Sequence, residues 1–194
     1  MSSPLLRNHL PLLAGLIFLA ALSRLLPHPP NFGPAGALAL FGAAVLPKRW
    51  MAVLVPFAAL YLSDLLLNNL VYGQYYEGFY AGVNWSVYLG FALTIGLGFW
   101  WLRGRAFSWA AIGGTTVATT LLFYFVTNLA SWYGMPALYP RSVAGVGAAL
   151  VAGLPFLANS LAGNVLFGAV LFGTARYLGW RSAPEVPRYV REND

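Results

Sequence analysis

Long apolar segments separated by short polar turns dominate the sequence. A helix needs about 20 apolar residues to cross a bilayer, so these segments predict about six membrane-crossing helices. We place the predicted spans at residues 9–26, 33–46, 50–71, 85–102, 107–130 and 154–178. The pattern therefore predicts an all-α integral membrane protein, with a single transmembrane domain over residues 1–180 and a polar tail at 181–194.

Two apolar segments fit this pattern poorly. The apolar part of the second span, Ala35 to Leu46, covers about 18 Å as a helix, less than a hydrocarbon core of about 30 Å. This helix must either extend into its flanking residues to cross the bilayer or pack as a short buried segment. Pro155 suits the first turn of a helix, so the last span is predicted to start at Leu154. Residues 143–153 are then predicted to form a separate outer or re-entrant helix.

Composition supports the membrane assignment. Hydrophobic residues make up 59% of the 194 residues and charged residues only 8%, whereas soluble domains carry about 25% charged residues. The mean hydropathy is +0.68. The first apolar segment lacks the cleavage site of a signal peptide, so we expect it to remain as the first span. The absence of cysteine excludes disulfides, thiolate nucleophiles and cysteine metal sites.

Basic residues predict the orientation of the bundle. With six spans, nine of the eleven lysines and arginines fall on one side, and only Arg24 and Arg141 fall on the other. Cytoplasmic loops are enriched in such residues, so both termini are predicted to be cytoplasmic. The basic residues lie at span ends without clustered stacking aromatics, which argues against nucleic acid as a partner and leaves membrane lipids.

Three loops on the predicted outer side carry most aromatic, amide and ionisable residues. They are residues 27–34, 72–84 and 131–142. The first is stiffened by three prolines, which would hold His28, Asn31 and Phe32 at the membrane boundary. Polar groups concentrated on one face of a bundle favour a ligand cavity open to that face.

Two ionisable residues are candidates for chemistry. Asp64 is the one acidic residue well inside a predicted span. It should face the interior near Tyr61, Asn68 or Asn128, either as a structural hydrogen-bond partner or in ligand contact or proton coupling. His28 could ligate a metal, respond to protons or be a polar residue at a helix end. The sequence lacks the motifs of ATP hydrolysis and of familiar proteases, so we do not expect an enzyme.

Four stretches together resemble the BtuM family of bacterial vitamin B12 transporters, which is related to the substrate-binding S-components of energy-coupling-factor transporters. They read PHPPNFGPAGALALFGAA, YLSDLLL, TNLASWYGMPALYPRSVAGV and LPFLANSLAGN, and the resemblance covers about residues 26–173. It implies a six-helix bundle that binds cobalamin from outside and takes it up across the bacterial inner membrane. It implies no cofactor of the protein's own.

The resemblance also implies site residues. It places His28 and Asn31 beside the ligand, with Asp64 in the third span and Arg141 in the fifth loop. Together with the outer aromatics and amides, the predicted ligand-binding set is His28, Asn31, Phe32, Asp64, Tyr76, Tyr80, Asn84, Tyr88, Asn128, Trp132, Tyr139 and Arg141. Part of the family carries a third-loop cysteine able to bind cobalt, which this chain lacks. His28 or another nitrogen could ligate cobalt instead, or the ligand is held without a protein ligand on cobalt.

Other functions stay open at this point. The first span lacks the AxxxA pattern of S-components that dock an energising module, which favours a protein that works alone. The chain could instead be an S-component for another vitamin or cofactor precursor that needs such a module. It could be a membrane enzyme using Asp64 as acid or base, which would require further convergent ionisable groups. A scaffold subunit would be favoured if the small-residue stripes faced lipid.

Overall fold

The computed structural model describes residues 10–179, and this part of the chain is helical without strands. The α-helices are α2 (Leu10–Leu22), α3 (Ala35–Val45), α4 (Arg49–Leu66), α5 (Trp85–Trp101), α6 (Trp109–Gly134) and α7 (Val143–Tyr177). Short helical turns follow α2 and α4, namely η1 (Ser23–Leu25), η2 (Leu67–Val71) and η3 (Gly73–Tyr75). The predicted all-α class is confirmed for the described residues.

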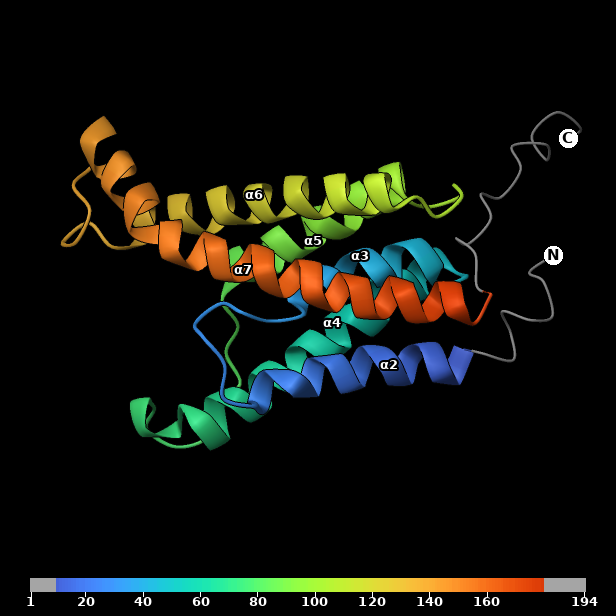
Figure 1. Cartoon of the computed structure of the whole chain (residues 1–194). Helices are drawn as coiled ribbons and strands as arrows, with labels where there is room; N and C mark the ends of the chain where they lie inside the picture. Colours follow the sequence, from blue (N-terminus) through green and yellow to red (C-terminus); the bar gives the residue numbers. More distant parts are fainter. Residues whose placement is uncertain (1–9, 180–194) are drawn as a thin grey trace, which may run out of the picture.

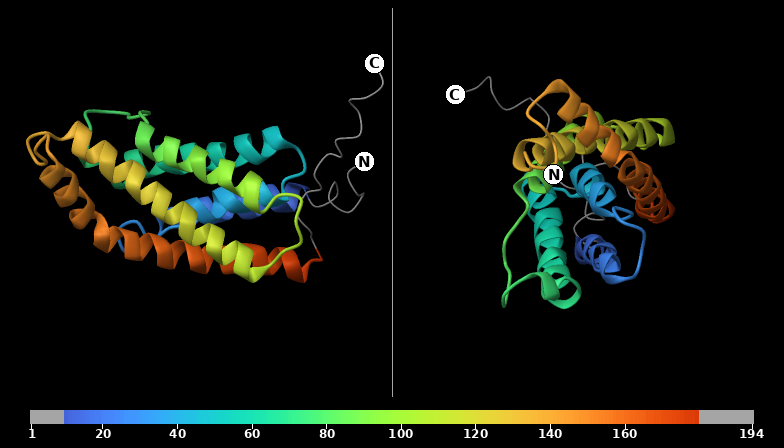
Figure 2. Two further views of the ribbon diagram at one scale, coloured as in Figure 1. Left: turned by 90° about the horizontal axis from the view of Figure 1, so that it is seen from above. Right: turned by 90° about the vertical axis from the view of Figure 1, so that its left-hand side faces the viewer.

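Helix α3 forms the centre of the bundle, surrounded by α2, α4, α5 and α7 (Figures 1 and 2). Every residue from Ala37 to Val45 is buried. Its Phe41 ring packs edge-on against Phe172 at a centroid distance of 5.3 Å. With 11 residues, α3 covers about 16 Å, too little to cross a bilayer by itself. Of the two predicted alternatives for this segment, the structure shows the short buried helix.

Three helical segments of the described chain are long and apolar enough to cross a membrane. They are Arg49–Val71, Trp109–Gly134 and Val143–Tyr177. The segments Ala14–Leu25, Ala35–Val45 and Trp85–Trp101 are apolar but shorter. This set of helices is compatible with a membrane protein.

Helix α7 differs from the prediction. It runs for 35 residues with Pro155 inside it, so the predicted helix start at Leu154 and the separate segment 143–153 are wrong. Proline removes one backbone hydrogen bond and bends a helix without necessarily ending it, and Figure 1 shows the bend in α7. The part of α7 before Pro155 packs along α6. Gly153 is buried at this contact, where a Cβ atom would collide with the Asn128 side chain.

The small-residue stripes lie inside the protein. Ala39 and Ala43 of α3 and Gly145, Ala149 and Gly153 of α7 are all buried. Stripes of this kind allow close helix approach. The lipid-facing arrangement that would favour a scaffold subunit is therefore not found for these residues.

The two ends of the bundle differ in their turns. The α3–α4 and α5–α6 turns and the end of α7 lie at one end, whereas the 72–84 loop and the α6–α7 loop lie at the other (Figure 1). The first group carries Lys48, Arg49, Arg103, Arg105 and Arg176. We call this group of turns the basic end.

Candidate functional site

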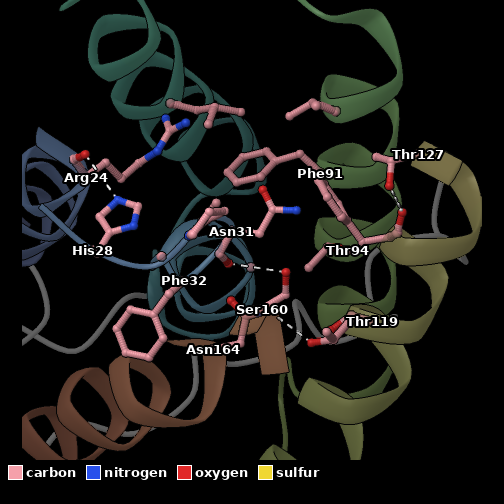
Figure 3. Close-up of a pocket in the computed structure, with 18 of the residues that line it drawn as sticks. Arg24, His28, Asn31, Phe32, Phe91, Thr94, Thr119, Thr127, Ser160 and Asn164 are labelled. Atoms are coloured by element: carbon pink, nitrogen blue, oxygen red, sulfur yellow. Dashed lines mark hydrogen bonds between the residues drawn. The ribbon is translucent and has the colours of Figure 1, made fainter. Parts of the chain in front are cut away.

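A cavity of about 430 Å³ lies between the first loop, residues 27–34, and helices α4 to α7 (Figure 3). We call it the main cavity. Its volume lies in the range of small-molecule pockets, about 300 to 1,000 Å³. Charged, amide and hydroxyl side chains share the wall with aromatic and aliphatic ones. The wall includes Arg24, His28, Asn31, Phe32, Leu60, Leu67, Tyr72, Val87, Phe91, Thr94, Thr119, Thr120, Phe123, Thr127, Ser160 and Asn164.

Helix α7 fixes the first loop in place. The Asn159 amide donates to the Pro30 carbonyl at 2.9 Å, and the Ser160 hydroxyl donates to the next carbonyl of the loop at 3.2 Å. One turn on, Gly163 meets the loop so closely that a Cβ atom would lie 2.7 Å from the Gly33 nitrogen. The loop is therefore a packed wall of the cavity.

Two residues predicted from the proline-rich loop take different positions in that wall. Asn31 has a positive φ of 61°, a left-handed conformation that asparagine tolerates better than most residues. Its side-chain amide points into the cavity (Figure 3). Phe32 lines the cavity and lies beside Phe167, at a ring-centroid distance of 6.3 Å.

His28 also lines the cavity, but backbone carbonyls occupy both of its ring nitrogens. Nδ1 lies 2.8 Å from the Pro29 oxygen and Nε2 lies 3.2 Å from the Arg24 oxygen. A metal ligand must offer a free nitrogen lone pair. In this conformation each ring nitrogen of His28 faces a carbonyl oxygen, so neither is directed at a metal in the cavity. No group of three or more His, Cys, Asp or Glu side chains that could hold a metal ion occurs within residues 10–179.

Asp64 takes part in an ion pair next to the cavity. Arg24 Nη1 lies 2.7 Å from Asp64 Oδ1 and donates to Ser63 Oγ at 2.5 Å. The Tyr88 hydroxyl donates to Asp64 Oδ2 at 3.0 Å. Arg24 lines the cavity, whereas Asp64 and Tyr88 are not part of its wall. Asp64 forms no hydrogen bond with Tyr61, Asn68 or Asn128, the three side chains that we predicted near it.

The opposite wall is built from hydroxyls and one amide. Asn164 is buried, and its amide donates to Thr120 Oγ1 at 3.0 Å and accepts from the Ala37 backbone at 3.2 Å. It joins α3, α6 and α7 beside Thr119 and Thr127. We did not predict these threonines as site residues. The available signal was their recurrence at helical spacing within an otherwise apolar segment of α6.

A second cavity of about 250 Å³ adjoins the first and shares Asn31 and Thr127 with it. We call it the side cavity. Two predicted site residues, Asn128 and Tyr139, line it. Asn128 is held by its own helix, since its amide donates to the Tyr124 carbonyl at 2.8 Å.

The predicted site residues of the 72–84 loop line neither cavity, although Tyr72 of the same loop lines the main cavity. Tyr76 and Tyr80 stack on each other with ring centroids 4.0 Å apart. Asn84 begins α5, its side chain accepting from the Ser86 nitrogen at 3.1 Å. In this structure these residues shape the loop and the start of α5.

Trp132 and Arg141 also lie outside both cavities. Trp132 Nε1 donates to the Pro140 carbonyl at 2.9 Å, and Arg141 Nη2 donates to the Tyr133 carbonyl at 2.6 Å. The Arg141 guanidinium lies 4.2 Å from the centre of the Tyr133 ring. Both hydrogen bonds join the α6–α7 loop to the last turn of α6.

Comparison with known proteins yields one family. No curated protein and no solved structure matches the chain significantly. A family model covers residues 5–186, which includes every helix and both cavities described above. The chain therefore belongs to this family, which is described as a family of unknown function (DUF6580).

Proposed function

We propose that the protein binds a small molecule in the main cavity and takes it up across the bacterial inner membrane, with cobalamin as the first candidate ligand. The observation that carries the proposal is the cavity itself, whose wall combines amide and hydroxyl side chains with aromatic rings. It is lined by residues near the end of α4, from the start to the middle of α5 and in the middle of α6, which places it between the middle of the bundle and the end opposite the basic end. Sites with an apolar wall and a few convergent polar groups are typical of ligand binding.

The proposed topology has six helices in the membrane. Helices α4, α6 and α7 have the length for a full crossing, while α5 covers about 26 Å with its 17 residues. Helix α3 reaches part of the way, and the first loop, which α7 holds by hydrogen bonds, precedes it. Because cytoplasmic loops are rich in arginine and lysine, we place the basic end and both termini in the cytoplasm.

Ligand size limits how cobalamin could bind. The main cavity holds a drug-sized group, so a corrinoid would insert one edge and rest its remaining surface under the third loop and the α6–α7 loop. Its amide side chains suit Asn31, Asn164 and the threonines, because amides donate and accept hydrogen bonds. The volume also favours a second candidate function, an S-component-like protein for a smaller vitamin or cofactor precursor that needs a separate energising module.

Absorption spectroscopy tests the first candidate. Detergent-purified protein, incubated with micromolar cyanocobalamin and freed of unbound ligand, is expected to retain corrin absorption at a near-stoichiometric amount. Asn31→Ala should weaken binding about tenfold, the effect of one lost hydrogen bond of about 1.4 kcal/mol. Arg105→Ala, at the basic end, should bind as the wild type does. No retained corrin would overturn the cobalamin assignment and favour the smaller ligand.

The same spectra test His28 as a cobalt ligand. Because both ring nitrogens contact backbone carbonyls, we expect the corrin bands of the bound ligand to be the same in the wild type and in His28→Ala. A band shift present in the wild type and lost in the variant would show that the ring turns to bind cobalt.

A further inference from the structure

We infer that Arg24 recognises an oxygen acceptor on the ligand, and that Asp64 and Ser63 are positioning residues that hold the guanidinium at the cavity wall. This inference rests on the proposed function, because it takes the main cavity to be a ligand site. It goes beyond that function by naming the residue that selects the ligand and the chemical group that it selects.

The first observation is the position of Arg24 relative to its partners. Arg24 lines the main cavity, whereas Asp64, Ser63 and Tyr88 do not. Figure 3 shows the Arg24 side chain reaching from its helical turn to the cavity. A ligand in the cavity would therefore meet the guanidinium and not the carboxylate.

The second observation is how the guanidinium uses its donors. Both protein contacts, to Asp64 Oδ1 and to Ser63 Oγ, are made by Nη1. Within the described chain, Nη2 and Nε have no hydrogen-bond partner. Since guanidinium groups donate only and present a planar fork, these free donors can bind a carbonyl or carboxylate oxygen.

The third observation is that Asp64 is already occupied. Its two oxygens accept from Arg24 and from the Tyr88 hydroxyl, at 2.7 and 3.0 Å. The Arg24 and Asp64 side chains are only 19% and 18% exposed, and the carboxylate neutralises the cation. A neutral acceptor such as an amide carbonyl therefore suffices as ligand partner, and a ligand need not bring a compensating negative charge.

The rest of the cavity describes the body of this ligand. Phe91 and Phe123 supply aromatic wall, and Thr127 and Asn164 supply hydrogen-bonding groups. Figure 3 shows Thr127 across the cavity from Arg24, with Phe91 between them. The arrangement fits a molecule with a flat apolar body, an oxygen acceptor at one end and a hydrogen-bonding group at the other.

Cyanocobalamin titration of the full-length protein in detergent tests the inference with four variants. We expect Arg24→Gln to bind at least tenfold more weakly, Asp64→Asn about threefold more weakly, and Arg105→Gln like the wild type. The double variant Arg24→Gln/Asp64→Asn should bind no more weakly than Arg24→Gln, because Asp64 acts through Arg24.

Additive losses of affinity in the double variant would overturn the positioning role of Asp64. Equal binding by Arg24→Gln and the wild type would overturn the role of Arg24. Melting temperatures of the ligand-free variants separate these effects from loss of fold.

A second set of probes separates this inference from the cobalamin assignment. Benzamide and benzoate carry an acceptor on a flat ring, whereas benzylamine carries only donors in its protonated form. By ligand-observed NMR, the wild type should bind one or both acceptor probes and not benzylamine, and Arg24→Gln should lose this binding at least fivefold. Binding of benzamide but not benzoate would identify a neutral carbonyl as the preferred group. Binding of benzoate but not benzamide would identify a carboxylate. Arg24-dependent fragment binding without cobalamin binding would overturn only the cobalamin assignment. Failure of every probe with the wild type would overturn both proposals.

Discussion

Replacing Arg103 by alanine is expected to lower the free energy of unfolding by about 3 kcal/mol. The residue follows α5 and is buried, with only 6% of its surface exposed. Its Nη1 donates to the Ala43 and Leu46 carbonyls at 2.9 and 3.0 Å, and its Nη2 donates to the Pro47 carbonyl at 2.8 Å. One side chain therefore caps the end of α3.

The size of this effect follows from the unpaired groups that alanine would leave. The last carbonyls of a helix have no partner within the helix, and α3 is the buried centre of the bundle. A hydrogen bond to a charged donor contributes about 1.5 to 3 kcal/mol. Burial, and to a smaller extent the charge of Arg49, lowers the pKa of the Arg103 guanidinium, but arginine remains charged in proteins.

Thermal unfolding in detergent measures this effect. Arg103→Ala should melt about 10 °C below the wild type. Arg103→Lys should lie between the two, because an ammonium group keeps the charge but lacks the planar fork. Exposed Arg105, in the same turn, is the control, and Arg105→Ala should change stability by less than about 0.5 kcal/mol. A wild-type melting temperature for Arg103→Ala would show that other groups satisfy the α3 carbonyls.

The same residue shows what sequence reasoning could and could not predict. The apolar segments located the starts of five helices to within a few residues, whereas the predicted start of α7 at Leu154 lies well inside the helix, which begins at Val143. Arg103 counted only as one of nine charges on the predicted cytoplasmic side. Its role depends on α3, about 60 residues earlier in the chain, and spacing along the sequence carries no information about that contact.

The site was predicted in part for the same reason. The prolines around His28 and Asn31 predict a loop of restricted conformation, because their effect on the backbone is local, and the structure places this loop in the wall of the main cavity. The sequence assigns Arg24 only to the outer side of the membrane. Its ion pair with Asp64, which fixes the positions of both side chains, joins residues 40 positions apart and leaves no signal in the sequence. Because proline is common in the first turn of a helix, Pro155 predicts a helix start, but α7 packs along α6 and continues through this residue.

Replacing Gly163 by alanine is expected to disturb both the fold and the main cavity. The new Cβ atom would lie 2.7 Å from the Gly33 nitrogen and 2.9 Å from its carbonyl oxygen. These are backbone atoms, so the contact cannot be relieved by turning a side chain. The first loop must move away from α7, which strains the bonds of Asn159 and Ser160 to it and displaces Asn31. Overpacking of this kind costs about 1 to 3 kcal/mol.

Helix α7 also supplies the matched control. Gly168 is buried in the same helix, but a Cβ atom there would meet nothing within 4 Å. Gly168→Ala should therefore keep or raise the stability, because alanine favours a helix by up to about 1 kcal/mol over glycine. Melting temperatures and binding of cyanocobalamin or the fragment probes, measured for both variants, should show losses in Gly163→Ala alone, with binding weakened more than tenfold. Normal binding by a destabilised Gly163→Ala would show that the first loop is not part of the ligand site, since this substitution moves that wall directly.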